Sequence, residues 1–231
     1  LSLLMKAHFA LDEQQEAFEY LAQHITRNPE VGYPRQLQGN LYIQTGNIEA
    51  AIKSYNELIA IQPESVDAQL GLAQAYQTRG DSNRALHAYS AAHALRPDDA
   101  QVLTLKAGVL DALGRHQEAM EAYETVLLLD SNQQIAANNL AMILIERFPS
   151  DKNFQRALAL TSPFEDTEIA TLRDTRGWAY YKTGDYTNAL RMIKPIFESD
   201  NVENIFWFHL GMTYYQLGDS ALAKEALTKS V

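Results

Sequence analysis

Apolar residues recur along the chain at helical spacing, in segments separated by short polar turns. Within residues 66–78, Leu72, Ala73 and Tyr76 lie at positions i, i+1 and i+4 and therefore share one face of a helix. A second segment with an apolar face follows after a glycine-containing turn and stops before Pro97, which prevents its continuation. The pattern predicts a hairpin of two helices, each roughly 20 Å long at 1.5 Å per residue.

This hairpin pattern repeats every 34 residues. The spacing is carried by the alanines Ala17, Ala51, Ala85 and Ala119, by the turn glycines Gly46, Gly80 and Gly114, and again by Gly184 and Gly218. Only 11 of the 231 residues are glycine, so three spaced by 34 and a further two with the same spacing are not a chance arrangement. The glycine suits the left-handed residue that ends a helix, and the chain is thus a series of similar units.

The residues within each unit resemble a known family. Trp207, Leu210, Gly211 and Tyr214 follow the spacing W-x2-L-G-x2-Y. The remaining positions of the motif are matched in an earlier unit by Gly39, Tyr42, Ala51, Tyr55 and Pro63. The sequence is identified as a member of the tetratricopeptide repeat (TPR) family. This resemblance implies an all-α fold, a right-handed solenoid (an αα superhelix) of about seven helix-turn-helix repeats.

We divide the chain into repeats that together form a single array over residues 1–231. Their boundaries are 1–31, 32–65, 66–99, 100–133, 134–169, 170–203 and 204–231. The first repeat lacks opening residues and the last lacks its tail, so we expect the segment to be a fragment of a longer protein. Leu222 and Leu227 on the final helix are left uncovered, which indicates either a longer array or pairing with another chain.

The fifth repeat departs from the pattern. It has no turn glycine, and residues 148–152 lengthen the turn instead. Its second helix is predicted to begin near Asn153 and to be cut short at Pro163. The change is either an insertion tolerated at an exposed turn or a local change in the curvature of the array.

Composition and charge exclude several classes of function. The chain has no cysteine, which excludes disulfides and thiol nucleophiles, and it has no apolar run long enough to span a membrane. Its 19 basic and 29 acidic side chains give a formal charge of −10, which argues against binding to nucleic acid.

No catalytic or metal-binding pattern is found in the sequence. None of the six histidines has the spacing of a metal-ligand motif, and no nucleotide-binding or nucleophile motif is present. Carboxylates such as Glu118 and Glu121 are expected on solvent-facing helix surfaces, where nothing shifts the pKa as acid–base catalysis requires. We therefore predict that the protein is not an enzyme and that it carries no metal and no cofactor.

The resemblance implies that the first helix of each repeat lines a concave groove, which suits an extended peptide or a partner's helix. In repeats 2–4 the groove positions hold mostly amides and hydroxyls, such as Gln36, Gln74 and Gln101. In repeats 5–7 the predicted partner-binding positions hold Asn138, Met142, Ile145, Asp174, Trp178, Tyr181, Phe208, Met212 and Tyr215.

Aromatic residues and methionine are enriched where partners bind, so the groove of repeats 5–7 is the predicted binding surface. Aromatic residues are usual in the family at the places of Tyr181, Phe208 and Tyr215, whereas Trp178 and the methionines replace the asparagine that is common there. The alternative is that these side chains pack between neighbouring first helices. A clamp for a peptide carboxylate is not expected, because its basic and amide residues are replaced by Gln36, Gln74, Gln101 and Leu105.

Arg173 and Arg176 occupy positions that are usually apolar in the repeat. Two interpretations are open. Their stems are buried while their charged ends reach water, or the charges bind an acidic partner.

The function predicted from these features is a non-catalytic scaffold that binds a peptide or partner protein in the concave groove. The alternative is a structural module that self-associates or spaces other domains of a larger protein. The segments 138–141 and 174–181 also resemble the later repeats of bacterial TPR proteins of the cell envelope, which favours an envelope, export or polysaccharide system. On that basis the periplasm or envelope is the expected location, with the cytoplasm as the alternative; no membrane insertion is expected, and the partner and the oligomeric state stay open.

Overall fold

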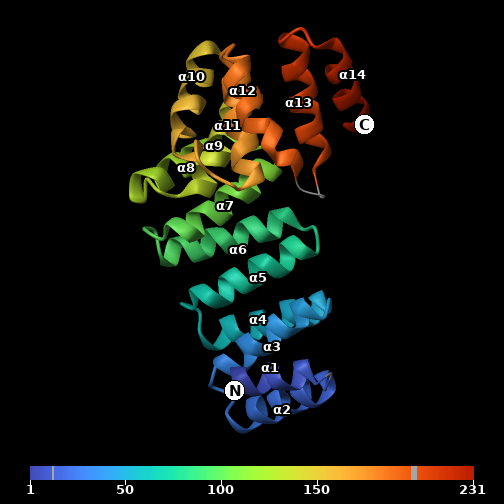
Figure 1. The fold of residues 1–231 in the computed structure, drawn as a ribbon. Helices are drawn as coiled ribbons and strands as arrows, with labels where there is room; N and C mark the ends of the chain where they lie inside the picture. Colours follow the sequence, from blue (N-terminus) through green and yellow to red (C-terminus); the bar gives the residue numbers. More distant parts are fainter. Residues whose placement is uncertain (12, 199–201) are drawn as a thin grey trace. The chain divides into compact units, whose positions relative to one another are not determined.

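The computed structural model describes residues 1–11, 13–198 and 202–231. Within these residues the secondary structure consists of fourteen α-helices and two short 3-10 helices, without a strand. Helices within a hairpin are joined by short turns, as between the helices Val66–Thr78 and Ser82–Leu95 (Figure 1). The predicted all-α fold of the TPR solenoid class is confirmed.

The chain divides into two compact units, Leu1–Ala122 (unit 1) and Tyr123–Val231 (unit 2). Unit 1 contains α1 (Ser2–Ala10), α2 (Gln14–Arg27), α3 (Tyr33–Gln44), α4 (Ile48–Ile61), α5 (Val66–Thr78), α6 (Ser82–Leu95), α7 (Ala100–Ala112) and the first half of α8 (His116–Leu129). Unit 2 contains the rest of α8, α9 (Gln134–Glu146), α10 (Asp151–Leu160), α11 (Ala170–Lys182), α12 (Tyr186–Ile193), α13 (Asn204–Gln216), α14 (Ser220–Lys229) and the 3-10 helices Ser162–Phe164 and Lys194–Glu198. A single array over residues 1–231 stays a prediction.

The turns inside the hairpins are built as their residues dictate. Gly80 has φ +81°, a left-handed conformation that side chains disfavour, and it ends α5. Asp81 then begins α6, because its side chain accepts a hydrogen bond from the backbone N–H of Arg84 at 3.1 Å. The same combination of a positive-φ glycine and an Asn or Asp cap recurs at Gly46–Asn47, Gly184–Asp185 and Gly218–Asp219.

Small residues allow the two helices of a hairpin to approach closely. The alanines of the 34-residue register are buried in both units; Ala51, Ala85 and Ala189 have no exposed surface. Opposite them, a Cβ atom at Gly177 would lie 2.4 Å from Cγ1 of Ile193, so the contact between α11 and α12 leaves no space for a side chain there.

The fifth repeat keeps its hairpin despite the longer turn. Ser150 caps α10, so this helix begins at Asp151, two residues before the predicted start, and it ends at Leu160. The chain then forms the 3-10 helix Ser162–Phe164, in which Phe164 is buried against Ala137 and Leu172. This short apolar anchor replaces the missing last turn of α10.

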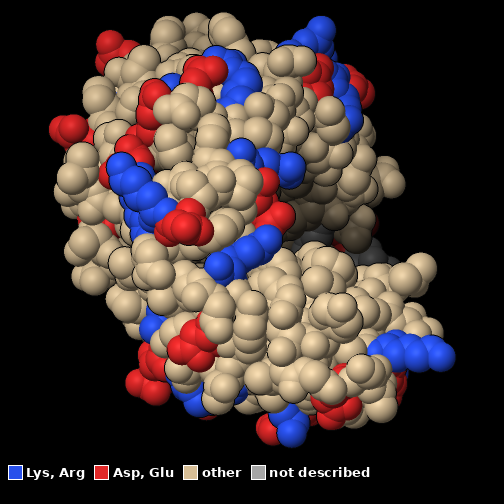
Figure 2. Space-filling model, turned by 90° about the horizontal axis from the view of Figure 1, so that it is seen from above, with Lys and Arg blue, Asp and Glu red and all other residues tan. Residues whose placement is uncertain are grey.

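The surface carries charged side chains of both signs. Basic and acidic side chains lie interspersed over the face shown in Figure 2. Among the helices of the described residues, none is long and apolar enough to cross a membrane. The same residues contain no group of three His, Asp or Glu side chains that would hold a metal ion.

Candidate partner-binding site

The nine predicted binding residues lie on three first helices of unit 2, namely α9, α11 and α13. Helix α11 contacts both α9 and α13, so the three helices form one layer. Side chains from this layer either fill the contacts between the helices or point outward. The nine residues differ in how much of each side chain reaches the surface.

Trp178 lies inside the layer. Its ring stacks on Tyr181, with centroids 4.4 Å apart, and on His209 of α13, with centroids 3.9 Å apart. Its Nε1–H donates a hydrogen bond of 2.7 Å to Oε1 of Glu146 at the end of α9. Only 4% of Trp178 is exposed, so it joins the three helices and presents little surface to a partner.

Asp174 and His209 form a buried polar pair beside this stack. Nδ1 of His209 lies 2.8 Å from Oδ2 and 2.9 Å from Oδ1 of Asp174, and both side chains are almost fully enclosed. Burial raises the pKa of the Asp174 carboxyl, and the hydrogen bond from His209 opposes part of that change. The pair satisfies polar groups that would otherwise be costly to bury between α11 and α13.

This pair is not among the contacts predicted from the sequence, although the spacing of its two residues contains a signal. The two residues are 35 positions apart, close to the length of one repeat, which places them at neighbouring levels of adjacent first helices. An acid and a histidine at that separation, both on first helices, indicate contact between repeats.

The remaining predicted residues differ in how far they reach the surface. Ile145 is buried, as Asp174 and Trp178 are. Phe208 and Tyr215 on α13 are exposed by 38% and 62%. The half-buried residues are Asn138, Met142, Tyr181 and Met212. Phe208 approaches the stack, with its ring centroid 6.0 Å from that of Trp178.

Both sequence-based interpretations of Arg176 are wrong. Its guanidinium is buried and pairs with Glu165, and it also donates to the carbonyl oxygen of Leu158 at 3.0 Å and to the hydroxyl of Tyr180 at 2.8 Å. Burial disfavours the charged form of Glu165, but hydrogen bonds from Arg176 and Arg191 outweigh it and lower the pKa of the Glu165 carboxyl. Arg176 therefore forms an ion pair within the protein, because the irregular segment after α10 brings the carboxylate of Glu165 to it.

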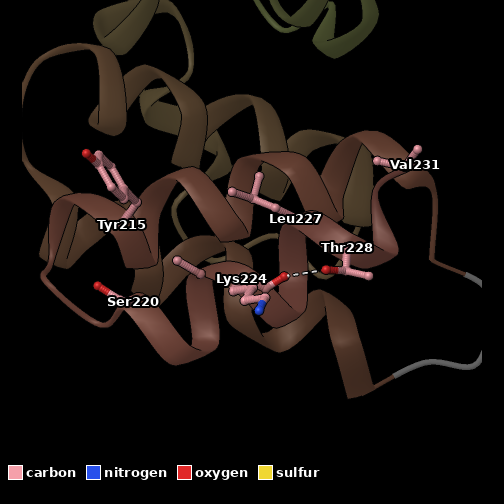
Figure 3. A pocket seen from close by; sticks show the side chains of 7 residues that line it. Tyr215, Ser220, Lys224, Leu227, Thr228 and Val231 are labelled. Atoms are coloured by element: carbon pink, nitrogen blue, oxygen red, sulfur yellow. Dashed lines mark hydrogen bonds between the residues drawn. The ribbon is translucent and has the colours of Figure 1, made fainter.

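A hollow of about 840 Å³ lies next to this layer, along α14. Figure 3 shows the side chains around it. Tyr215 of α13 lies at one end, and Leu227 and Val231 follow toward the other end. Leu222 on the same helix is exposed by 39%, and Leu227 is half-buried. The hollow extends an apolar surface from Tyr215 along α14.

A protein of paired helices with a 34-residue period belongs to the class of helical-repeat proteins. Comparison with known families shows which repeat family this is. The model described as "Tetratricopeptide repeat" matches residues 70–134 and 175–230, and the model described as "TPR repeat" matches residues 39–80. The chain belongs to the tetratricopeptide repeat family. Its fold is thus that of a scaffold for protein–protein interaction.

Two curated proteins resemble parts of the chain. RNA polymerase II-associated protein 3 of Xenopus laevis is 27% identical over 191 residues, which are 77% of this chain and 29% of that protein. Cellulose synthase operon protein C of Pseudomonas fluorescens (strain SBW25) is 28% identical over 115 residues, which are 50% of this chain and 9% of that protein. The chain therefore spans less than a third of the length of either relative.

Solved structures show the same fold. A tetratricopeptide repeat protein from Parabacteroides merdae has a TM-score of 0.74 at 16% identity, covering 99% of this chain and 89% of that one. YrrB, described as a TPR protein with an unusual peptide-binding site, has a TM-score of 0.63 at 17% identity, covering 90% of this chain and 97% of that one. At these identities the likeness concerns the fold alone.

Proposed function

We propose that this chain is a non-catalytic scaffold that binds a peptide or partner protein on the first-helix layer of unit 2. The observation that carries the proposal is the exposure of Phe208 and Tyr215 on α13, where the Phe208 ring lies beside the buried ring of Trp178. Aromatic side chains have few rotatable bonds, so they lose little conformational freedom on binding, and they are frequent anchors of protein interfaces.

The buried members of the predicted site have a supporting role in this proposal. Trp178 and Asp174 hold α11 against α13 through His209, and they thereby fix the surface on which Phe208 lies. The exposed and half-buried residues make the contact with the partner: Asn138, Met142, Tyr181, Phe208, Met212 and Tyr215.

Two comparisons support the finer parts of the proposal. YrrB is described as having a peptide-binding site on the same fold, which favours a peptide as the ligand. The likeness to cellulose synthase operon protein C favours a bacterial envelope, export or polysaccharide system. The excess of acidic side chains favours a protein partner over nucleic acid.

The test is truncation of the two exposed aromatic residues. The double substitution Phe208→Ala with Tyr215→Ala is expected to weaken binding of a captured partner at least about tenfold, because both anchors are lost. Affinity is measured by calorimetric titration of the purified partner. Truncation of Trp178 is not suitable, since its loss would also open the contact between α11 and α13.

Tyr20→Ala provides the matched control. Tyr20 is an aromatic residue on α2 of unit 1 with the same exposed fraction as Phe208, 38%. It is expected to leave the affinity unchanged, and circular dichroism should show equal helicity for all variants. Equal affinity of the double variant and the wild type would refute the assignment to α13.

A further inference from the structure

A polar hollow in unit 1 has a chemistry different from that of the aromatic surface in unit 2. It has a volume of about 480 Å³ and lies against α3, α5 and α7, and Tyr89 of α6 also lines it. Five of its lining side chains are amides: Gln36, Asn40, Gln74, Gln77 and Gln101. Amides both donate and accept hydrogen bonds, so the orientation of each one decides what the hollow offers to a ligand.

Buried tyrosine hydroxyls set two of these orientations. Tyr55 donates a hydrogen bond of 2.5 Å to Oδ1 of Asn40, and Tyr89 donates one of 2.5 Å to Oε1 of Gln77. The amide oxygens of Asn40 and Gln77 are thereby engaged by hydroxyls of the protein itself. The NH₂ groups of Asn40 and Gln77 are the parts of these side chains that a ligand can use, and they are donors.

Gly71 makes the arrangement at Asn40 possible. A Cβ atom at Gly71 would lie 2.2 Å from Cε1 of Tyr55, so the tyrosine ring occupies the space of the missing side chain. The repeats on either side carry Leu37 and Leu105 at this position of the 34-residue register. The glycine therefore distinguishes this repeat and lets the hydroxyl of the buried Tyr55 reach Asn40 from α4.

The charge of the hollow restricts the ligand further. Asp67 is its single ionisable acid, and none of its lining residues is Lys, Arg or His. Asp67 is exposed, as is Gln101. A peptide carboxylate pairs most strongly with cationic side chains, which this lining lacks, and Asp67 would repel it, whereas a Lys or Arg side chain would be attracted to Asp67. Leu70 and Leu105 add apolar surface beside it.

We propose that this hollow binds an internal, extended segment of a partner polypeptide that carries a Lys or Arg side chain. Backbone carbonyls of the segment accept hydrogen bonds from the oriented amides, the basic side chain faces Asp67, and an apolar neighbour contacts Leu70 and Leu105. This second site rests on the proposed scaffold function for its relevance, but its residues and its chemistry belong to unit 1 alone.

The test uses two capped nonapeptides in a Gly-Ser background, labelled with fluorescein and titrated with the full chain. One peptide has lysine at its centre between two leucines, and the other has glutamate in the same place. The lysine peptide is expected to bind about tenfold more tightly, because attraction to an exposed carboxylate and relief of like-charge repulsion each change affinity about threefold. Asp67→Lys is expected to reverse this preference.

Two control variants make the result decisive. Asp151→Lys reverses an exposed charge in the first turn of α10 in unit 2, as Asp67→Lys does in α5, and it is expected to keep the lysine preference. The pair Phe208→Ala with Tyr215→Ala is also expected to keep it. Loss of peptide binding in that pair would place the peptide on unit 2 and overturn the inference, while leaving the proposed function standing.

The inference is equally overturned if neither peptide binds at millimolar concentration, or if both bind with the same affinity. A preference that survives Asp67→Lys, in protein of unchanged helicity, would also refute it. Partner capture by α13 is measured separately, so failure of either proposal can be recognised without the other.

Discussion

Tyr55 connects the interior of a repeat with its surface. It has no exposed area, yet its hydroxyl reaches Asn40 in the groove of unit 1. The sequence predicted Tyr55 as a repeat position, because the 34-residue register marks it. That its ring would lie against Gly71, and would orient an amide, depends on space that only the packed helices define.

Burial raises the pKa of Tyr55 to about 12, which predicts a loss of stability in alkali. The unfolded state ionises at the ordinary value of 10, so stability is unaffected below pH 10 and falls as the pH rises from 10 to 12. A change of two pKa units corresponds to about 2.7 kcal/mol. Urea unfolding followed by circular dichroism at several pH values measures how steeply the free energy of unfolding falls with pH.

Tyr55→Phe is the control for that prediction. The variant is expected to lose the part of the alkaline slope that Tyr55 contributes, even if its stability at pH 7 is lower through loss of the bond to Asn40. An identical slope in the wild type and the variant between pH 10 and pH 12 would contradict the assignment.

At the scale of elements, contacts between α11 and its neighbours combine apolar packing with buried polar groups. The helix boundaries follow from local signals such as Gly184 and Asp185, and these were readable in the sequence. The partners of Arg176 were not, because Glu165 lies in the irregular segment after α10 and reaches α11 only through the folding of that segment. Local signals define a helix, whereas its polar contacts depend on what the neighbouring element presents.

The pair of Asp174 and His209 gives a prediction at this scale. His209→Leu keeps a similar side-chain volume but leaves the Asp174 carboxyl buried without its partner. The free energy of unfolding is therefore expected to fall by about 3–5 kcal/mol. Addition of Asp174→Asn is expected to recover part of this loss, since a neutral amide is less costly to bury. Urea unfolding monitored by tryptophan fluorescence measures both variants; a loss below about 1 kcal/mol for His209→Leu would argue against a structural pair.

At the scale of the whole molecule, the repeats form two units that each have buried clusters of their own. Ile193, Phe206 and Leu210 belong to one such cluster in unit 2, and Val66, Ala92 and Val102 to another in unit 1. In repeat proteins stability is approximately a sum of repeats and nearest-neighbour contacts. A substitution in one unit should therefore act mainly on that unit.

The distribution of tryptophan allows this to be tested. Both tryptophans, Trp178 and Trp207, lie in unit 2, so fluorescence reports on that unit while circular dichroism reports on the whole chain. Tyr55→Ala is expected to shift the circular dichroism transition to a lower urea concentration and to leave the midpoint of the fluorescence transition unchanged. Phe164→Ala, a buried change in unit 2, is expected to shift the fluorescence midpoint. A common shift of both signals in Tyr55→Ala would show one cooperative molecule instead.

The sequence by itself determined the period, the helices, the turn glycines and the family, because these depend on interactions within a hairpin of 34 residues that recurs along the chain. It also placed the nine predicted binding residues on first helices. Only the tertiary structure decided that Trp178 and Asp174 are enclosed while Phe208 and Tyr215 are exposed, and that Tyr55 orients Asn40. Exposure of a side chain on a helix depends on the residues that an adjacent helix brings against it, and those residues lie a full repeat away in the sequence.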